Sequence, residues 1–572
     1  MRERIRRLTF DLLQRFGHIE TALELRYRFN SRRRRIGDSV ALRMAPQRIR
    51  QEARAEGTGL AVHRTDGTRP LVVVFRRRDD PSIVAVANSN SRIVEECLDR
   101  GGIPTRAIPI SSVNRARLAV LDDDHDRVIQ ALRRYGPSTL YLYIDDRTIP
   151  RGRRLHHIAS AGKRFDRAIA DARIVRVFEF RADALANDVS GDLYGCEIEF
   201  WCDAAEAEDD GGEAFGSDGG DLVRAHRANL ESTLLPRTEF SHRSTRSDLD
   251  LLPLIEDVTF DVDVVYTWVD GDDPDWLSRR EAALGGSPSD HIHEEAASDA
   301  RYTSFDELRY SLRSLERFAD FVRHVYLVTD AQRPVWLVDD HPRLSVVDHR
   351  QIFDDHSCLP TFNSHSIESR LHHIPGLSEH YVYMNDDFLF GRRVVASNFF
   401  FGNGIAKFFP SAAMVPSGAI DIHTKPVDMA AMNGRDLVER EFSRRVIRKM
   451  RHAPYPQLRT VQLDIERRFP AEVARTTASR VRSQTDLSLA SFLHHHVAHA
   501  TGRALPATIR NEYVDLGRPD LERKLARLAS TQTFDTLCLN DTDSLAVSRA
   551  TKQRIVQSFL ETYLPEASSF ER

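Results

Sequence analysis

Several short apolar segments of this sequence end in aspartate, a pattern that can gather carboxylates at one edge of a sheet. The clearest is the β-branched and aromatic run Val264–Val269, which stops at the turn-forming sequence Asp270–Pro274. Val325–Asp330 and Leu344–Asp348 follow the same rule. In open α/β sheets, ligands bind outside the carboxyl ends of the strands, so these carboxylates are candidates for ligand contacts. The alternative is a series of surface turns, because Asp, Gly and Pro are ordinary turn residues.

The sequence Asn385-Asp386-Asp387 interrupts a strongly apolar strand pattern over residues 381–390. Carboxylates among apolar neighbours are costly to bury unless they are paired or bind a cation. Mg²⁺ or Mn²⁺, held by one or two carboxylates and a substrate diphosphate, suits this set of oxygen ligands. The alternative is a tight hairpin turn. Asn540-Asp541 repeats the pattern near the C-terminus, where a cap for the following helix is the competing interpretation.

His452 is the histidine whose neighbours best suit acid–base chemistry. Prolines keep its segment out of a helix, and five Arg or Lys residues lie between 444 and 451. A histidine beside cations can deprotonate an acceptor hydroxyl, or act as an acid when phosphate is near. The alternative is a loop histidine that is merely exposed.

A second group of histidines, over residues 494–499, has a spacing that could bind zinc. His495 and His499 are four residues apart, as two zinc ligands on one helix would be. No H-E-x-x-H motif is present and no third ligand is evident, so a partly buried polar helix face is the favoured interpretation. His494, His495, His496 and His499 therefore receive no role, and a zinc hydrolase remains an alternative function.

The composition limits the class of protein. The 572 residues are 41% hydrophobic and 29% charged, which predicts two to four globular domains. A net charge of -4 argues against a nucleic-acid partner. Five scattered cysteines without a C-x-x-C motif favour a reduced, cytoplasmic protein. We expect no membrane-spanning segment, because no apolar run reaches the length of about 18 residues that a span needs. We expect no secretory signal either, because the N-terminus lacks an uninterrupted apolar region.

Four regions are predicted along the chain. Residues 1–60 form a basic amphipathic segment; residues 1–50 alone contain fourteen Arg against five Asp or Glu, a balance that suits peripheral contact with an anionic membrane face or packing on the protein itself. Residues 61–204 predict an α/β accessory domain, with strands at 71–75 and 140–144 and helices at 90–100 and 126–135. Residues 205–222 are an acidic, Gly-rich linker.

The long region 223–572 alternates strands and helices, which predicts a mostly parallel, doubly wound α/β sheet. A helix is expected over Ser304–Arg317, with Ser304 as its cap and Glu307 completing a capping box. The strand that ends at Asp270 would open this sheet, and the carboxylates described above would meet at the carboxyl edge.

Four sequence blocks of this region resemble the Stealth family of bacterial capsular sugar-phosphate transferases, which have an animal relative in the lysosomal N-acetylglucosamine-1-phosphotransferase. The first block is Val264–Asp273. The second comprises Arg309–Ser314, Leu359–Ser364, Ile367-Glu368 and Tyr383–Asp387. The third spans about His423–Gly502 and includes His452–Pro454 and Arg482–Asp486. The fourth comprises Cys538–Asp541, Leu564-Pro565 and Ser569–Glu571.

The resemblance implies a glycosyltransferase-A-like fold and transfer of a hexose 1-phosphate, or an N-acetylhexosamine 1-phosphate, from a nucleotide diphosphosugar to a hydroxyl of an acceptor glycan. It implies a UDP-sugar donor, a polysaccharide or lipid-linked acceptor, and Mg²⁺ or Mn²⁺. The catalytic candidates it implies are His452, Asp270, Arg482 and Asp486. The substrate-binding candidates are Trp268, Asp270, Gly271, Asp273, Arg309, Arg313, Asn363, Asn385 and Arg435. The metal-binding candidates are Asp386, Asp387, Asn540 and Asp541.

Two other functions remain open alongside the zinc hydrolase. A conventional glycosyltransferase on the same fold would attack the anomeric carbon and release a nucleoside diphosphate. A non-catalytic glycan- or membrane-binding protein would keep the fold without needing Asp387 or His452. We expect a cytoplasmic protein, peripheral on the inner face of the membrane if residues 1–50 bind lipid, with homo-oligomers a further expectation.

Overall fold

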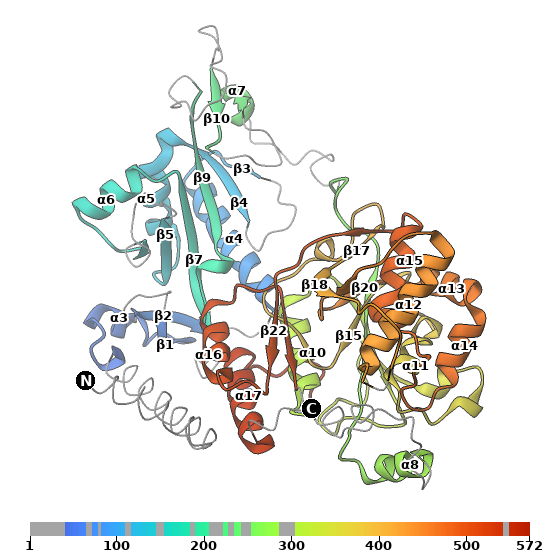
Figure 1. The fold of residues 1–572 in the computed structure, drawn as a ribbon. Coiled ribbons are helices and arrows are strands. Elements are labelled where there is room, and N and C mark those ends of the chain that lie inside the picture. Colours follow the sequence, from blue (N-terminus) through green and yellow to red (C-terminus); the bar gives the residue numbers. More distant parts are fainter. Residues whose placement is uncertain are drawn as a thin grey trace. The chain divides into compact units, whose positions relative to one another are not determined.

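The structure is a computed structural model of the chain. It describes residues 41–63, 71–77, 82–108, 116–144, 154–182, 189–204, 221–226, 234–241, 253–284, 304–421, 423–541 and 548–572. Two compact units are present (Figure 1). The accessory unit lies within Leu25–Leu254, and the C-terminal unit contains Ile255–Leu528 and Gln532–Arg572. Residues 1–40 of the predicted basic segment (1–60) and residues 205–220 of the predicted linker (205–222) lie outside the described residues.

The accessory unit is a mixed sheet with helices packed against it. Its strands are β1 (Thr58–His63), β2 (Leu71–Arg77), β3 (Arg106–Ala107), β4 (Arg117–Leu121), β5 (Leu140–Ile144), β6 (Leu155–His157), β7 (Ile174–Ala182), β8 (Val189–Ser190), β9 (Cys196–Asp203), β10 (Leu222–Arg224) and β11 (Leu234–Pro236). Its helices are α3 (Gln47–Glu52), α4 (Ile83–Arg100), α5 (His125–Tyr135), α6 (Lys163–Ala170) and α7 (Arg237–Ser241). Helix α4 begins seven residues before the predicted start, because the Ser82 hydroxyl caps it at Val84 N–H.

Strands β10 and β11 belong to the accessory sheet, although they follow the residue at which the sequence pattern starts the C-terminal region. β10 pairs antiparallel with β9 and with β11. The physical reason is burial: Val223 packs in a core cluster with Trp201 and Phe240. These strands are therefore held by the sheet that precedes them in sequence.

The C-terminal unit is built on a five-stranded sheet with the order β14-β13-β12-β15-β20. The strands are β12 (Val262–Thr267), β13 (Val322–Thr329), β14 (Leu344–Asp348), β15 (His380–Asn385) and β20 (Tyr455–Leu458). The first four are parallel to one another, and β20 is an antiparallel edge strand. β12 and β15 are buried on both faces, which explains their continuous apolar runs. The predicted α/β class is confirmed.

The direction in which strands are added reverses at β12. β13 and β14 follow on one side of it, whereas β15 pairs on its other side, so that Thr267 and Asn385 face each other at the two carboxyl ends. Ligands of open α/β sheets bind in the crevice outside such a reversal. The topology therefore selects the β12 and β15 ends as the place to look for a site.

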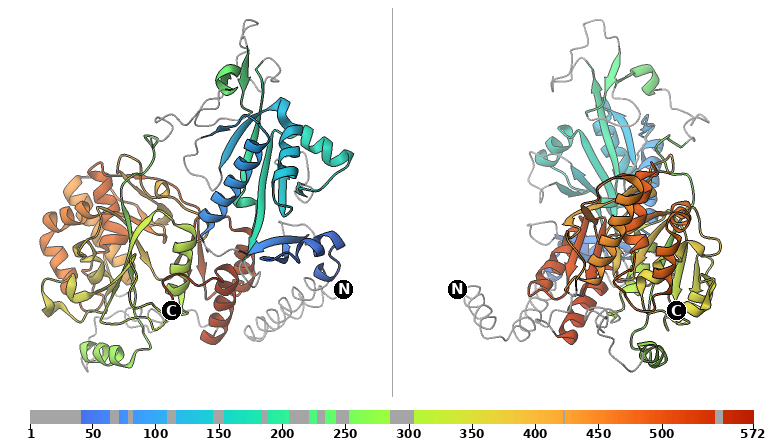
Figure 2. Two further views of the ribbon diagram at one scale, coloured as in Figure 1. Left: turned by 180° about the vertical axis from the view of Figure 1, so that it is seen from behind. Right: turned by 45° about the vertical axis from the view of Figure 1, so that its right-hand side comes forward.

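Smaller sheets and helices complete the C-terminal unit. The small sheets are β16 (Phe388–Phe390) with β23 (Thr536–Asn540) and β22 (Asn511–Asp515), β17 (Ala406–Phe408) with β21 (Ala504–Pro506), and β18 (Pro410–Met414) with β19 (Arg448–Met450). The helices are α8 (Pro274–Leu284), α10 (Glu307–Phe318), α11 (Ser364–Glu368), α12 (Pro426–Phe442), α13 (Arg459–Arg468), α14 (Pro470–Ala478), α15 (His494–Ala500), α16 (Leu521–Thr531) and α17 (Arg549–Tyr563). Helices α12 to α15 gather together, and both sides of the molecule show this group (Figures 1 and 2). None of the described helices is both long and apolar enough to cross a bilayer.

Candidate active site

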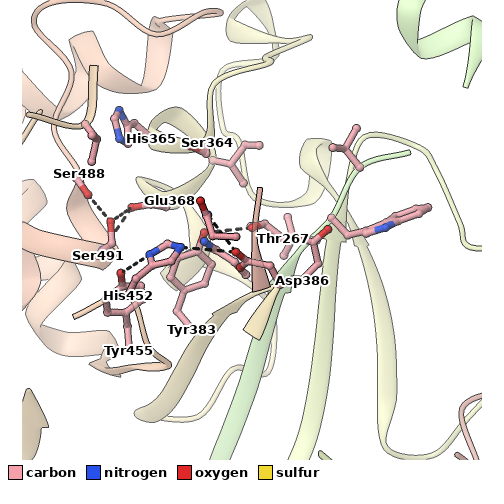
Figure 3. Close-up of a pocket in the computed structure, with 18 of the residues that line it drawn as sticks. Thr267, Ser364, His365, Glu368, Tyr383, Asp386, His452, Tyr455, Ser488 and Ser491 are labelled. Carbon is pink, nitrogen blue, oxygen red and sulfur yellow. Dashed lines mark hydrogen bonds and ion pairs between the residues drawn. The ribbon is translucent and has the colours of Figure 1, made fainter. Parts of the chain in front are cut away.

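A cavity of about 540 Å³ lies at the carboxyl ends of β12 and β15 (Figure 3). This volume is in the usual range for sites that bind small ligands. The cavity gathers residues from distant parts of the C-terminal unit. The predicted residues that line it are Trp268, Asn385, Asp386, Asp387, His452, Arg482, Asn540 and Asp541.

The apolar pattern predicted as one strand over 381–390 divides at Asp386 and Asp387. β15 ends at Asn385 in the main sheet, and β16 begins at Phe388 in a different sheet. Successive residues of one strand point to opposite faces, whereas the turn lets both carboxylates line the cavity. Pairing of β16 with β23 then brings Asn540 beside the turn, with its Nδ2 3.3 Å from Asp387 Oδ2.

Asp387 has one satisfied and one unsatisfied carboxylate oxygen. Its Oδ2 accepts hydrogen bonds from Asn540 Nδ2 and from the Cys538 thiol, each at 3.3 Å. Burial and the charge of Asp387 hold the pKa of the Cys538 thiol well above its ordinary value, so the thiol keeps its proton. The Oδ1 atom is buried and has no hydrogen-bond partner among the described residues. Leaving a buried polar atom unpaired costs about 1–3 kcal/mol, so this oxygen is available for a ligand.

Glu307 and Asp386 are buried carboxyls of the cavity whose pKa values are raised to near neutrality. Burial raises the pKa of Asp386 to about 7, and the charge of Asp387 adds to this effect. Burial raises the pKa of Glu307 to about 8, and Asp386 contributes the next largest effect. The sequence pattern assigned Glu307 to a capping box, and its Oε2 does accept the Phe305 N–H at 2.6 Å. The packing of α10 against β16 brings Glu307 near Asp386. The sequence alone does not predict this contact.

The helix that carries Glu307 starts later than the sequence pattern predicts. It begins at Glu307 instead of Ser304, because Asp306 adopts a left-handed φ of 70°. The Ser304 hydroxyl accepts the Asp306 N–H at 3.0 Å. This irregular start leaves the Glu307 carboxyl at the cavity wall.

His452 lies beside the Asp386-Asp387 turn, between two polar groups. Its Nδ1 lies 3.3 Å from the Tyr455 hydroxyl, and its Nε2 lies 3.7 Å from Asp387 Oδ2. The ring packs edge-on against Phe388, with a centroid separation of 4.8 Å, and remains one-third exposed. A histidine held in this way can exchange a proton with a ligand in the cavity.

A second polar network also lines the cavity (Figure 3). A π-helical turn over Leu489–Leu493 presents Ser491, whose hydroxyl and N–H lie 3.3 and 3.4 Å from Glu368 Oε2. Burial raises the pKa of Glu368, while the charges of His365 and Arg482 oppose this effect. Arg482 donates from Nη2 to the Ser364 hydroxyl at 3.0 Å. Glu368 belongs to the second of the four sequence blocks, but no sequence signal predicts a role for it.

The oxygen ligands of the cavity fit a hard divalent cation. Asp387 contributes an unpaired oxygen, and burial together with neighbouring carboxylates raises the pKa values of Asp386 and Glu307, an effect that a bound cation would oppose. A geometric set of Asp387, His452 and Cys538 also exists, but the protonated thiol argues against a soft metal. Asp541 is ion-paired with Lys552 at 2.5 Å, and Asn540 Oδ1 accepts the Tyr513 hydroxyl at 2.9 Å. Ser548 caps the helix that follows them.

Asp270, Gly271 and Asp273 form a structured turn after β12 and do not line the cavity. Gln332 fixes this turn: its Nε2 donates to the Asp270 carbonyl at 3.0 Å and to Asp273 Oδ2 at 2.8 Å. Asp273 Oδ1 accepts the Asp275 N–H at 2.9 Å at the start of α8. The hydrogen bond from Gln332 is the main cause of the lowered pKa of Asp273.

The remaining predicted residues are held by protein partners. Arg309 and Arg313 both bind Glu571, the latter from Nη2 at 2.7 Å. Asn363 donates to Asp486 at 2.8 Å. Burial raises the pKa of Asp486, but hydrogen bonds from His365 and its neighbours outweigh this effect and hold it below the ordinary value. Arg435 donates to the Pro416 carbonyl at 2.7 Å.

The histidine-rich helix α15 is packed into the core of its unit. Burial lowers the pKa of His494 to about 3 and that of His496 to about 4, so these rings are neutral. His494 Nε2 accepts the Leu458 N–H at 2.9 Å. Among the described residues, the groups of three that could hold a metal are Asp387–His452–Cys538 and His372–His373–Glu466. Neither group contains a residue of α15.

Comparison with known protein families identifies four matching segments in the C-terminal unit. Stealth protein conserved region 1 matches residues 260–288, region 2 matches 301–408, region 3 matches 451–499 and region 4 matches 526–572. These segments contain the β12 turn, Glu307, Asp386 and Asp387, His452, and Asn540. The resemblance found in the motifs is confirmed.

Relatives with similar length extend the match into the accessory unit. An exopolysaccharide phosphotransferase of Streptomyces coelicolor is 41% identical over 541 residues, which are 90% of this chain and 87% of the relative. A second one from the same organism is 37% identical, over 86% of this chain and 91% of the relative. Exopolysaccharide phosphotransferase CpsY of Mycobacterium tuberculosis is 35% identical, over 71% and 74%. The chain belongs to the Stealth family, and it is a phosphotransferase.

Proposed function

We propose that this enzyme transfers a sugar 1-phosphate from a nucleotide diphosphosugar, a UDP-sugar first among them, to a hydroxyl of an acceptor glycan in exopolysaccharide synthesis. The observation that carries the proposal is the unpaired Asp387 oxygen in one cavity with His452, Asp386 and Glu307. The printed names of the relatives support the reaction class. The strand order and the position of the cavity support a glycosyltransferase-A-like site, in which the donor lies along the β12 and β15 ends.

The donor diphosphate is bound at the carboxylate turn in this proposal. Asp387, Asp386 and Glu307 would hold a divalent cation, Mg²⁺ or Mn²⁺, which neutralises charge on the diphosphate when bound. Loss of the protons from Asp386 and Glu307 accompanies binding, because ionised carboxylates are the ligands. The nearby indole of Trp268 and the amide of Asn385 line the same part of the cavity and are available to the nucleotide.

His452 acts as the base toward the acceptor. When its Nδ1–H donates to the Tyr455 hydroxyl oxygen, the Nε2 lone pair is free to take the acceptor proton. The imidazolium that results lies 3.7 Å from Asp387 Oδ2, which stabilises the positive charge. Tyr455 is fully buried in an apolar environment that raises its own pKa well above the ordinary value, so it stays a neutral hydrogen-bond partner.

Arg482 supplies positive charge from the part of the cavity that contains Ser364 and Glu368. Its guanidinium is held toward the cavity by Ser364 and lies near enough to Glu368 to influence the pKa of that carboxyl. Guanidinium groups suit phosphate oxygens because their donors are planar and paired. In the reaction, the acceptor oxygen attacks the sugar-proximal phosphorus, and the bond to the departing nucleoside monophosphate breaks. The product is a phosphodiester that retains the sugar configuration, because no bond to the anomeric carbon breaks.

The identity of the nucleotide product separates this reaction from ordinary glycosyl transfer. The purified enzyme is incubated with Mg²⁺ or Mn²⁺, a panel of UDP-sugars and a short capsular acceptor, and the nucleotides are resolved by chromatography. We expect acceptor-dependent release of UMP. Release of UDP alone would overturn the proposal in favour of a conventional glycosyltransferase.

The matched controls are Asp387→Asn and Asp270→Asn, which make the same change at the two strand ends. UMP release should disappear with Asp387→Asn and persist with Asp270→Asn, because only Asp387 has an unpaired oxygen in the cavity. Equal thermal stability of the two variants would exclude unfolding as the cause of any loss.

A further inference from the structure

A group of exposed arginines leads along the chain to the catalytic histidine. Arg444, Arg445, Arg448 and Arg451, which we call the arginine ridge, all have exposed side chains. Within the part of the chain that the structure describes, no carboxylate forms an ion pair with any of them. The Arg451 guanidinium donates from Nε to the Pro410 carbonyl at 3.4 Å. The ridge therefore presents four uncompensated positive charges.

The acidic residues around the ridge already have other partners. Glu472 binds Arg440 and Glu441 binds Arg468, each at 2.8 Å. Asp428 binds Lys449. Glu439 is adjacent as well, but its Oε1 accepts the Val446 N–H and forms no ion pair with a ridge arginine among the described residues. These carboxylates therefore leave the ridge arginines without ion-pair partners, and the field of the ridge can act on an external anion.

The ridge has a defined backbone. Val446 is 7% exposed and anchors the segment among apolar residues, while its N–H lies 3.3 Å from Glu439 Oε1. The Val415 N–H donates to the Ile447 carbonyl at 3.0 Å, and β19 pairs with β18. Such a framework keeps the guanidinium groups on one structured segment instead of a loose loop.

The ridge leads directly into the cavity wall. Lys449, Met450 and His452 line the cavity, and Arg448 and Arg451 flank them in sequence. Arg448 is four residues from His452, so their Cα atoms are separated by at most about 14 Å. An extended ligand whose terminal hydroxyl reaches His452 can therefore contact these arginines with the units next to its end.

We infer that the arginine ridge binds the acceptor, and that this acceptor is a glycan that already contains phosphodiesters. The inference rests on the proposed function, since each sugar-1-phosphate transfer leaves one negative phosphodiester in the product. A growing chain is then a polyanion with a neutral hydroxyl at its end. Arginine pairs well with phosphate oxygens, and a row of them favours a chain that carries repeated phosphates. An anionic membrane is the competing partner, because Ile447 is 50% exposed and Met414 is 68% exposed on the paired strands.

The test compares binding of two labelled oligosaccharides by fluorescence anisotropy at low and at physiological salt. The probes are a short glucose-1-phosphate oligomer joined by phosphodiesters and a maltooligosaccharide of equal length. The key variant replaces all four ridge arginines with glutamine. We expect the phosphodiester oligomer to bind the native enzyme with an affinity that falls as salt increases, and the variant to bind it at least about tenfold more weakly. The neutral oligomer should bind the native enzyme and the variant with similar affinity.

The control replaces four exposed arginines elsewhere in the C-terminal unit with glutamine, so that the net charge changes equally. These are Arg467, Arg475, Arg523 and Arg527. The control should bind the phosphodiester oligomer like the native enzyme. Equal binding by the ridge variant and the native enzyme would overturn the inference, as would equal weakening in the control.

Two further measurements separate the competing outcomes. Sedimentation with vesicles of phosphatidylglycerol and phosphatidylcholine tests the membrane: loss of vesicle binding in the ridge variant, with oligomer binding unchanged, would assign the ridge to lipid. Because anisotropy does not require turnover, ridge-dependent binding without UMP release would contradict the proposed reaction while supporting the acceptor surface. UMP release without ridge-dependent binding would contradict the acceptor surface alone.

Discussion

The turn after β12 and the turn after β15 are neighbours at the same edge of one sheet, and both carry aspartates. At β12, the Asp270 carboxylate accepts the Asp272 N–H, and the Asp273 carboxylate accepts Gln332 Nε2 and the first N–H groups of α8. At β15, Asp386 holds a proton near neutral pH and Asp387 keeps an oxygen without a described partner. The two turns thus differ in whether protein groups fulfil the hydrogen-bonding capacity of their carboxylates.

This comparison shows why a carboxylate at a strand end is an incomplete signal for function. Both turns lie next to the reversal in strand order, so topology alone does not separate them. The protein stabilises one turn with its own donors and leaves the other with accumulated negative charge, which is unfavourable without a ligand. The β15 turn is therefore where we expect substitutions to change chemistry, and the β12 turn is where we expect them to change stability.

The largest expected effect comes from Asp387→Asn. Loss of the charge would remove a proposed cation ligand and the proposed partner of protonated His452, so the rate of UMP release should fall by on the order of 10³-fold or more. Asp270→Asn should retain activity within about tenfold, because its side chain contacts only the Asp272 N–H within the turn. Steady-state rates of the two variants check this difference, and equal losses would contradict it.

The next effect concerns His452 and, by contrast, His494. His452→Gln should lower the rate by about 10²–10⁴-fold with little change in melting temperature, because it removes the proposed base from a one-third exposed position. His494→Leu should leave the rate of the folded fraction nearly unchanged but destabilise the protein by about 1–3 kcal/mol, because the buried Leu458 N–H loses its acceptor. Paired rate and denaturation measurements test this contrast. A stable His452 variant with full activity would remove the base from the mechanism.

The sequence predicts the α/β class, the strand carboxyl ends and the family well, because these depend on local apolar runs and on motif spacing. It does not predict which polar groups meet. Arg309 and Arg313 look like ligand-binding residues, yet Glu571, 258 residues after Arg313, binds both. Glu307 looks like a helix cap, yet packing brings its carboxyl near Asp386. These pairs are brought together by tertiary packing, which the periodicity of apolar residues in the sequence does not reveal.

The protons on the β15 turn predict a pH-dependent response to metal. Asp386 and Glu307 have folded pKa values of about 7 and about 8, above their ordinary values of 3.8 and 4.5. The folded state therefore binds more protons than the unfolded state in this interval, and metal-free stability falls as pH rises from about 4 to about 8. A cation bound to the ionised carboxylates opposes that loss. Mg²⁺ or Mn²⁺ should raise the melting temperature more at pH about 8 than at pH about 6.

Thermal scans with the metals and with a chelator check this prediction, and Asp387→Asn is the control. The variant should show a much smaller shift at the higher pH, because it lacks one of the proposed ligands. A metal-dependent shift that is equal in the two proteins, or that is larger at the lower pH, would contradict binding at this turn.

The smallest expected effect is at the β12 turn. Asp273→Ala removes the acceptor for the first N–H groups of α8 and should destabilise the enzyme by about 1 kcal/mol. The rate of the folded enzyme should stay within about twofold of the native value, because Asp273 does not line the cavity. Urea denaturation and initial rates measure the two effects. A large loss of rate without loss of stability would show that this turn takes part in the reaction.

The fate of the sugar-proximal phosphorus tests the central claim most directly. A UDP-sugar labelled with ³²P at the phosphate attached to the sugar is incubated with the enzyme and a short acceptor, and the products are separated by size and charge. We predict that the label enters the acceptor as a phosphodiester resistant to phosphatase, with unlabelled UMP released. Label recovered entirely in UDP, with unlabelled sugar joined to the acceptor, would contradict sugar-phosphate transfer.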